Sequence, residues 1–123
     1  MKRPPDVTDA EWRVMEVLWT RSPLSSAEII AELLASTGWK ANTVRTLLAR
    51  LVRKGAIKAS GDASRYFYQA RFSREEYVSE VSESFLERVF RGAAEPLLLH
   101  FAGKAQLSRK KIAELRRLLE EEE

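Results

Sequence analysis

Residues 41–54 combine side-chain types that can recognise a nucleic acid with a spacing that brings them together. At 100° per residue the segment predicts a helix with one apolar arc, formed by Val44, Leu47, Leu48, Leu51 and Val52. The opposite arc, apart from Ala49, is polar or basic, and it consists of Asn42, Thr43, Arg45, Thr46, Arg50, Arg53 and Lys54. A solvated helix face usually mixes both charge signs, whereas this arc contains no acid.

The absence of acids extends beyond this helix, because none lies between Glu32 and Asp62. The whole chain has a formal net charge of +3, with a net basic segment at 1–72 and a net acidic segment at 73–123. A polyanion is the natural partner of such a basic stretch. An ordinary basic surface is the alternative interpretation of the charge alone.

The start of the helix carries a stripe of side chains suited to the floor of a DNA groove, namely Asn42, Thr43, Thr46 and Arg50. Asparagine pairs bidentately with adenine, arginine with guanine, and a threonine methyl group contacts the thymine methyl group. The side chains expected to contact phosphates flank this stripe, and they are Lys40, Arg45, Arg53 and Lys54. The N-terminus of the helix also attracts a phosphate.

Trp39, directly before this helix, allows two interpretations. Its ring either fills the core at the turn, or its indole N–H donates to a phosphate of the DNA backbone. We favour the phosphate donor, because the neighbouring helices already supply apolar side chains for a core.

Capping boxes predict where three helices begin, at Thr8–Glu11, Ser25–Glu28 and Ser73–Glu76. In each box the hydroxyl accepts from the amide three residues later, while the glutamate reaches back to the first amide. The expected helices span about 9–20 and 26–36 in the first half of the chain. The basic helix follows from about residue 41 and ends at Gly55, a residue type that favours a left-handed helix end.

After Gly55 the periodicity changes from 3.6 to 2. Residues 56–59 and 65–68 are short strand-like runs on either side of a turn at 60–63, which predicts a β-hairpin. A hairpin of this size needs support from the helices. Three helices followed by a hairpin predict a winged helix-turn-helix domain over residues 1–72.

The hairpin carries both basic and aromatic side chains. Lys58 and Arg65 are expected to contact the DNA backbone or the minor groove. The aromatic run Tyr66, Phe67 and Tyr68 either packs under the hairpin or stacks on single-stranded bases. Packing is the stronger interpretation, because a small hairpin needs apolar contacts with the helices.

Residues 73–123 predict three further helices, at about 73–91 and 94–102 and after a cap at Ser108. Their apolar surface is larger than this segment can bury, so we expect a helical dimerisation domain that packs against a second copy. Folding back onto residues 1–72 in a monomer is the alternative. The residues expected at the dimer contact are Tyr77, Val81, Phe85, Val89, Leu98, Phe101, Leu115 and Leu118. The fold class is thus mainly α with a small β-hairpin.

Catalysis, cofactors and metals find little support in the sequence. The chain has no cysteine, and its single histidine, His100, lies in an apolar run. It has no glycine-rich phosphate loop, no HExxH and no nucleophile elbow. No apolar run approaches the ~20 residues of a membrane span, and the first residues lack a signal-peptide core. We therefore expect a cytoplasmic protein without membrane insertion that is not an enzyme and binds no cofactor.

Four stretches, which together cover more than half of the chain, resemble the penicillinase-repressor family, of the BlaI, MecI and CopY type. VTDAEWRVMEVLW resembles the first helix of the family, and GWKANTVRTLLARLVRKGAI resembles its recognition helix and the exit into the wing. SFLERVFRGAAEPLLLHFAGKAQLS and AELRRLLEEEE resemble its dimerisation region. The pattern around Trp39, Thr43, Val44 and Thr46 is the most specific part of this match.

The resemblance implies a dimeric bacterial repressor that binds a palindromic operator in double-stranded DNA. It also implies a membrane-bound β-lactam sensor whose metalloprotease domain triggers cleavage within the dimerisation region. The scissile Asn–Phe bond of the family corresponds to His100–Phe101 in this sequence. The copper-responsive branch carries a cysteine-rich site that this chain lacks.

A winged helix that binds an acidic protein surface is the alternative of a different class. An acid-free face fits this function as well, but it gives no reason for the uninterrupted Asn and Thr stripe.

Overall fold

The computed structural model describes residues 3–62, 65–103 and 108–121. The chain divides into two compact units, Met1–Val81 and Ser82–Glu123, which we call the N-terminal unit and the C-terminal unit.

The N-terminal unit contains α1 (Asp9–Thr20), α2 (Ser26–Thr37) and α3 (Ala41–Lys54). The reciprocal hydrogen bonds predicted at the first two capping boxes are present, with Thr8 and Ser25 as the capping residues. The predicted helix starts are therefore confirmed, because each cap satisfies amides that the helix itself leaves free.

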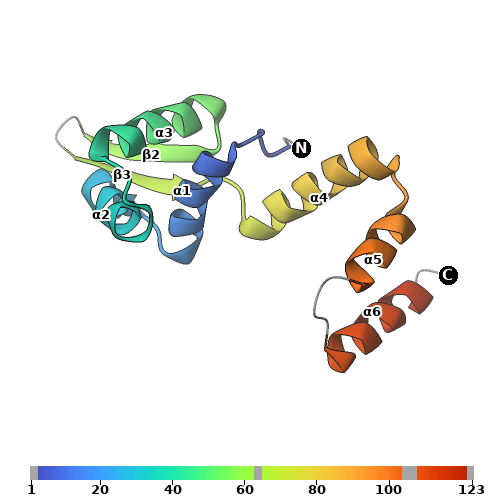
Figure 1. The fold of residues 1–123 in the computed structure, drawn as a ribbon. Coiled ribbons are helices and arrows are strands. Elements are labelled where there is room, and N and C mark those ends of the chain that lie inside the picture. The colour runs from blue at the N-terminus through green and yellow to red at the C-terminus, as the bar shows by residue number, and fades with distance from the viewer. Residues whose placement is uncertain (1–2, 63–64, 104–107, 122–123) are drawn as a thin grey trace. The chain divides into compact units, whose positions relative to one another are not determined.

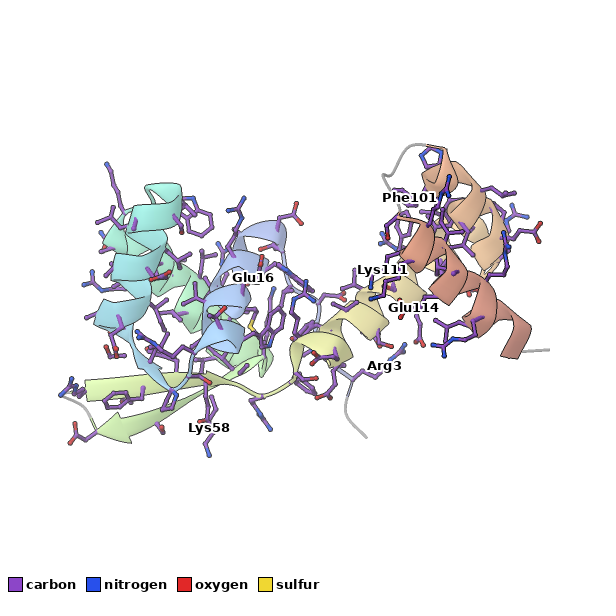
Figure 2. The ribbon with its side chains drawn as sticks, turned by 90° about the horizontal axis from the view of Figure 1, so that it is seen from below. Arg3, Glu16, Lys58, Phe101, Lys111 and Glu114 are labelled. Carbon is purple, nitrogen blue, oxygen red and sulfur yellow. The ribbon has the colours of Figure 1, made fainter. Side chains whose placement is uncertain are left out.

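A three-stranded antiparallel sheet completes this unit, in the order β1-β3-β2. Figure 1 shows its two longer strands, β2 and β3, side by side. β2 (Ile57–Asp62) and β3 (Arg65–Ala70) form the predicted hairpin, with strands slightly longer than expected. β1 (Leu24–Ser25) was not expected, because two residues are too short to show an alternating pattern. Figure 2 shows α1, α2 and α3 together on one face of the sheet.

The core of the N-terminal unit lies between the three helices and the sheet. α1 contributes Val14, Met15 and Leu18, whereas the sheet contributes Leu24 and Ile57. The inner arc of α3 is buried as predicted, with Val44, Leu47, Leu48 and Leu51. Only Val52 of that predicted arc stays exposed.

α4 (Arg74–Phe90) begins at the third predicted capping box, where Ser73 and Glu76 exchange hydrogen bonds of 3.0 Å. Its first turn belongs to the N-terminal unit, because Tyr77 is 1% exposed. The Tyr77 ring lies 5.6 Å from the Trp19 ring and 6.0 Å from the rings of Trp12 and Phe72, measured between centroids. Aromatic rings at this spacing attract one another beyond their burial.

This packing corrects two predictions. Tyr77 was assigned to the dimer contact, but it lies in the core of its own chain and is not available to a second copy. The N-terminal unit continues to Val81 instead of ending at residue 72, because the first turn of α4 packs against α1. The apolar stripe of α4 in the sequence could not show that its first turn packs within its own chain while later turns stay exposed.

The C-terminal unit comprises the end of α4 together with α5 (Ala94–Ala102) and α6 (Arg109–Glu121). The predicted cap of α6 is confirmed, since the Lys111 amide donates to the Ser108 hydroxyl at 3.2 Å. Leu98 is partly buried. The large apolar side chains that stay exposed in this unit are Phe85, Val89, Leu99, Phe101, Ile112, Leu115 and Leu118. Within the described ranges, no helix is both long and apolar enough to cross a bilayer.

Candidate nucleic-acid interface

The outward face of α3 carries the predicted base-reading stripe. Asn42, Thr43, Thr46 and Arg50 are all exposed, while the opposite side of the helix is buried in the core. Burial of one arc fixes which arc faces outward, so the stripe is presented by a helix that cannot rotate without exposing its apolar side. Arg45 and Arg53 are exposed on the same helix.

The N-terminus of α3 differs from those of α1 and α2. Lys40 precedes it in an extended conformation, and among the described residues no side chain caps it. The amide groups of the first turn therefore keep their capacity to donate to an anion. Together with the helix dipole, these amides favour a phosphate oxygen at this position.

Two hydrogen bonds organise the stripe in the free protein. The Arg45 guanidinium donates to the Asn42 side-chain oxygen at 3.2 Å, and the Thr46 hydroxyl donates to the Asn42 carbonyl at 2.9 Å. The Thr46 proton is thus used within the helix, which leaves its methyl group and oxygen lone pairs for an outside partner. Because an amide oxygen has two lone pairs, the bond from Arg45 still allows Asn42 to pair with a base through both amide atoms.

The wing adds basic side chains at its exposed surface. Figure 2 shows Lys58 on the face of the sheet away from the helices. The Arg65 guanidinium lies over the Phe67 ring, 5.3 Å from its centroid, and the Arg65 amide donates to Asp62 at 3.1 Å. Both Lys58 and Arg65 are exposed.

The aromatic residues of the wing do not share one environment. Tyr68 is partly buried and packs against the core, as expected for a hairpin supported by helices. Tyr66 is 46% exposed and pairs across the ladder with Gly61, which has no side chain to cover it. The predicted packing is therefore confirmed for Tyr68 and not for Tyr66.

Trp39 is half-buried and packs against the core. The contact agrees with the core interpretation, which the sequence favours less than the phosphate donor.

Lys54 and Glu11 form a contact that sequence reasoning missed. The Lys54 ammonium donates to the Glu11 carboxylate and to the Asp6 carbonyl, the latter at 3.2 Å. Lys54 had been assigned to a DNA phosphate, but in the free protein its charge is already paired within the chain. The sequence did hold a signal, because Glu11 falls on the same helical arc as Met15 and Leu18. An acid on an apolar arc requires a compensating partner.

The electrostatics of Glu11 follow from this contact. Burial by itself raises the pKa of the Glu11 carboxyl, but hydrogen bonds from the Lys54 ammonium and the Thr8 amide outweigh it. The pKa of Glu11 therefore lies below its ordinary value, and the carboxylate is charged at neutral pH. In the part of the chain that is described, no three His, Asp or Glu side chains gather as a metal site would need.

Three helices, a two-stranded wing and an outward-facing third helix define a winged-helix protein of the DNA-binding type. The comparisons with known proteins agree with this class. The monomeric BlaI of Bacillus licheniformis, solved with the blaP half-operator, superposes with a TM-score of 0.54 and 34% identity. That match covers 63% of this chain and 94% of the BlaI structure.

Sequence comparison identifies the family. The model of the penicillinase repressor family matches residues 7–121. The penicillinase repressor of Bacillus licheniformis is 36% identical over 121 residues, which cover 98% of this chain and 94% of the relative. The methicillin resistance regulatory protein MecI of Staphylococcus aureus is 32% identical over 114 residues, which cover 93% of each chain. The chain belongs to the penicillinase repressor family of DNA-binding transcriptional repressors.

Proposed function

We propose that this protein represses transcription by binding a palindromic operator as a homodimer. The observation that carries the proposal is the exposed, acid-free face of α3, which begins with an uncapped helix N-terminus. A helix of this kind enters the major groove with its first turns against the base edges. The Bacillus licheniformis relative, which was solved in complex with a half-operator, supports operator binding by this fold.

Within this mode the side chains divide into two groups. Asn42, Thr43, Thr46 and Arg50 read base edges. The residues that hold the phosphate backbone are Lys40, Arg45, Arg53, Lys58 and Arg65, all of which are exposed. Lys54 leaves the backbone set, because its ammonium is paired with Glu11. Trp39 packs its ring against the core and remains in the proposed set through its indole N–H.

Dimerisation supplies the affinity that a single small domain lacks. The exposed apolar side chains of the C-terminal unit, with Val81, offer the contact between copies. A second half-site then binds at a high effective concentration, so the dimer holds a palindrome far more tightly than one domain holds a half-site. Separation of the two C-terminal units releases the operator.

Proteolysis between His100 and Phe101 would cause this separation. Both residues are exposed on α5, where their rings lie 5.4 Å apart. Cleavage there removes α6 from the chain and divides the apolar surface of the C-terminal unit. A membrane-bound sensor with a protease domain is the partner that this regulation requires.

Selection from a pool of random DNA duplexes tests the proposed function. The purified full chain is incubated with the pool at near-physiological salt, and the bound duplexes are sequenced. We expect an inverted repeat with half-sites about one helical turn apart. Salt-sensitive binding without any enriched sequence would contradict the proposal, because it would mean that α3 reads no bases.

A further inference from the structure

One carboxylate joins the first helix of the N-terminal unit to the end of α3. Glu11 on α1 has no solvent-exposed surface. One of its oxygens accepts from the Thr8 amide at 2.8 Å and from the ammonium of Lys54, the last residue of α3. The Lys54 ammonium also donates to the Asp6 carbonyl.

We infer that Glu11 is a positioning residue for DNA recognition. Its charge fixes the C-terminal end of α3 on α1, and this anchor sets the angle at which the stripe from Asn42 to Arg50 meets the bases. The inference rests on the proposed function, because it concerns the helix that reads the operator.

Capping alone does not account for Glu11. α2 and α4 use Glu28 and Glu76 in the same capping box, and both of these glutamates are exposed. Glu11 makes the same cap but is buried as well, and burying a carboxylate is costly without a charged partner. Its burial is therefore explained by the contact with Lys54 and not by the needs of the cap.

Lys54 is the main group that balances the buried negative charge of Glu11. The second Glu11 oxygen and the Tyr77 hydroxyl are both buried, and neither has a hydrogen-bond partner among the described residues. The Glu11 charge is thus balanced by Lys54 together with the Thr8 amide. This pair has a defined geometry, whereas the apolar contacts of α3 are non-directional and allow the helix to shift.

The variant Glu11→Gln isolates the charge from the cap, because glutamine also serves at this position of a capping box. The measurement is the ratio of affinities for the selected operator and for random duplex, each corrected for the folded fraction. We expect the ratio to fall about tenfold, as for the loss of one base contact. Glu16→Gln, on the exposed side of the same helix, is the matched control and should keep the wild-type ratio.

A double variant, Glu11→Gln with Lys54→Met, separates positioning from folding. It contains no unpaired charge at this junction, so its stability should recover relative to Lys54→Met alone. The affinity ratio should stay low, because the anchor between α1 and α3 is still missing. The salt dependence of binding should match that of the wild type, because Lys54 contacts no phosphate.

Three results would overturn the inference. A wild-type ratio in Glu11→Gln, or a ratio that recovers with stability in the double variant, would mean that Glu11 acts only through folding. A salt slope that flattens by about one unit in the double variant would mean that Lys54 does bind a phosphate. Failure of the proposed function is distinguishable, because the wild type itself would then show no preference for any duplex.

Discussion

At the scale of single residues, Arg50 and Arg53 offer a matched pair on α3, since both are exposed arginines one turn apart. Arg50→Ala should weaken operator binding by about 1–3 kcal/mol and relax selectivity at one base pair. Arg53→Ala should weaken binding to all sequences alike and flatten the salt slope by about one unit. Titrations of operator and random duplex over a range of salt concentrations measure both effects. Identical behaviour of the two variants would contradict the division between base and phosphate contacts.

Removal of Lys54 and removal of Glu11 should lower the free energy of unfolding by different amounts. The Lys54 side chain is 34% exposed and can turn to water, whereas that of Glu11 is 0% exposed and cannot. Lys54→Met should therefore lower the free energy of unfolding by roughly 3–5 kcal/mol, and Glu11→Gln by less. Denaturant titrations measure the free energy of unfolding of each variant. If Glu11→Gln lowered the free energy of unfolding more than Lys54→Met, the result would contradict a Glu11 carboxylate that is buried and cannot turn to water.

Tyr77 predicts a loss of stability at alkaline pH. Burial, with the nearby charges of Glu11 and Asp6, raises the pKa of Tyr77 to about 12. An unfolded tyrosine ionises near pH 10, so the folded state holds the proton more tightly. The stabilisation is complete below about pH 10 and is lost as the pH rises toward 12, by roughly 2–3 kcal/mol. Tyr77→Phe should lack this part of the pH dependence, and an unchanged alkaline profile would contradict the assignment.

At the scale of elements, two glycines adopt backbone conformations that other residues disfavour. Gly61 lies in the wing, and Gly38 ends α2. An added Cβ at Gly61 would collide with the Arg65 carbonyl, whereas at Gly38 it would meet open space. Gly38 is left-handed, with a φ of 78°, so Gly38→Ala should cost about 1–2 kcal/mol. Gly61→Ala should cost more, because its φ of 120° is strained for any side chain and the collision adds to this strain. Thermal unfolding measures both, with Ser60→Ala as a control expected to stay near the wild type.

The elements also show where sequence reasoning succeeds and where it ends. The helix starts at Thr8, Ser25 and Ser73 and the arcs of α3 were predictable, because caps and periodicity act within a few residues. β1 and the burial of Tyr77 were not, because each depends on a partner far along the chain. The pairing of Lys54 with Glu11 was also not predictable, because the two residues lie far apart in the sequence. A sequence shows that Glu11 needs a cation, but only the fold shows which one approaches it.

At the scale of the whole molecule, the apolar surface of the C-terminal unit predicts self-association. Val89 is 55% exposed, so Val89→Glu disturbs little packing within the chain. We expect this variant to sediment as a monomer, because the charge would have to be buried between copies. Ser84→Glu, at an exposed polar position of α4, should remain a dimer. A monomeric wild type, or a dimer that tolerates Val89→Glu, would contradict the proposed contact.

Parallel selection from random duplexes with the wild type and with Arg50→Ala tests whether α3 reads the bases of an operator. We expect the wild type to enrich an inverted repeat, and the variant to lose its preference at one symmetric position in each half-site. Enrichment of the same sequence by both proteins would show that Arg50 reads no base. Enrichment of no sequence by either would contradict operator recognition through α3.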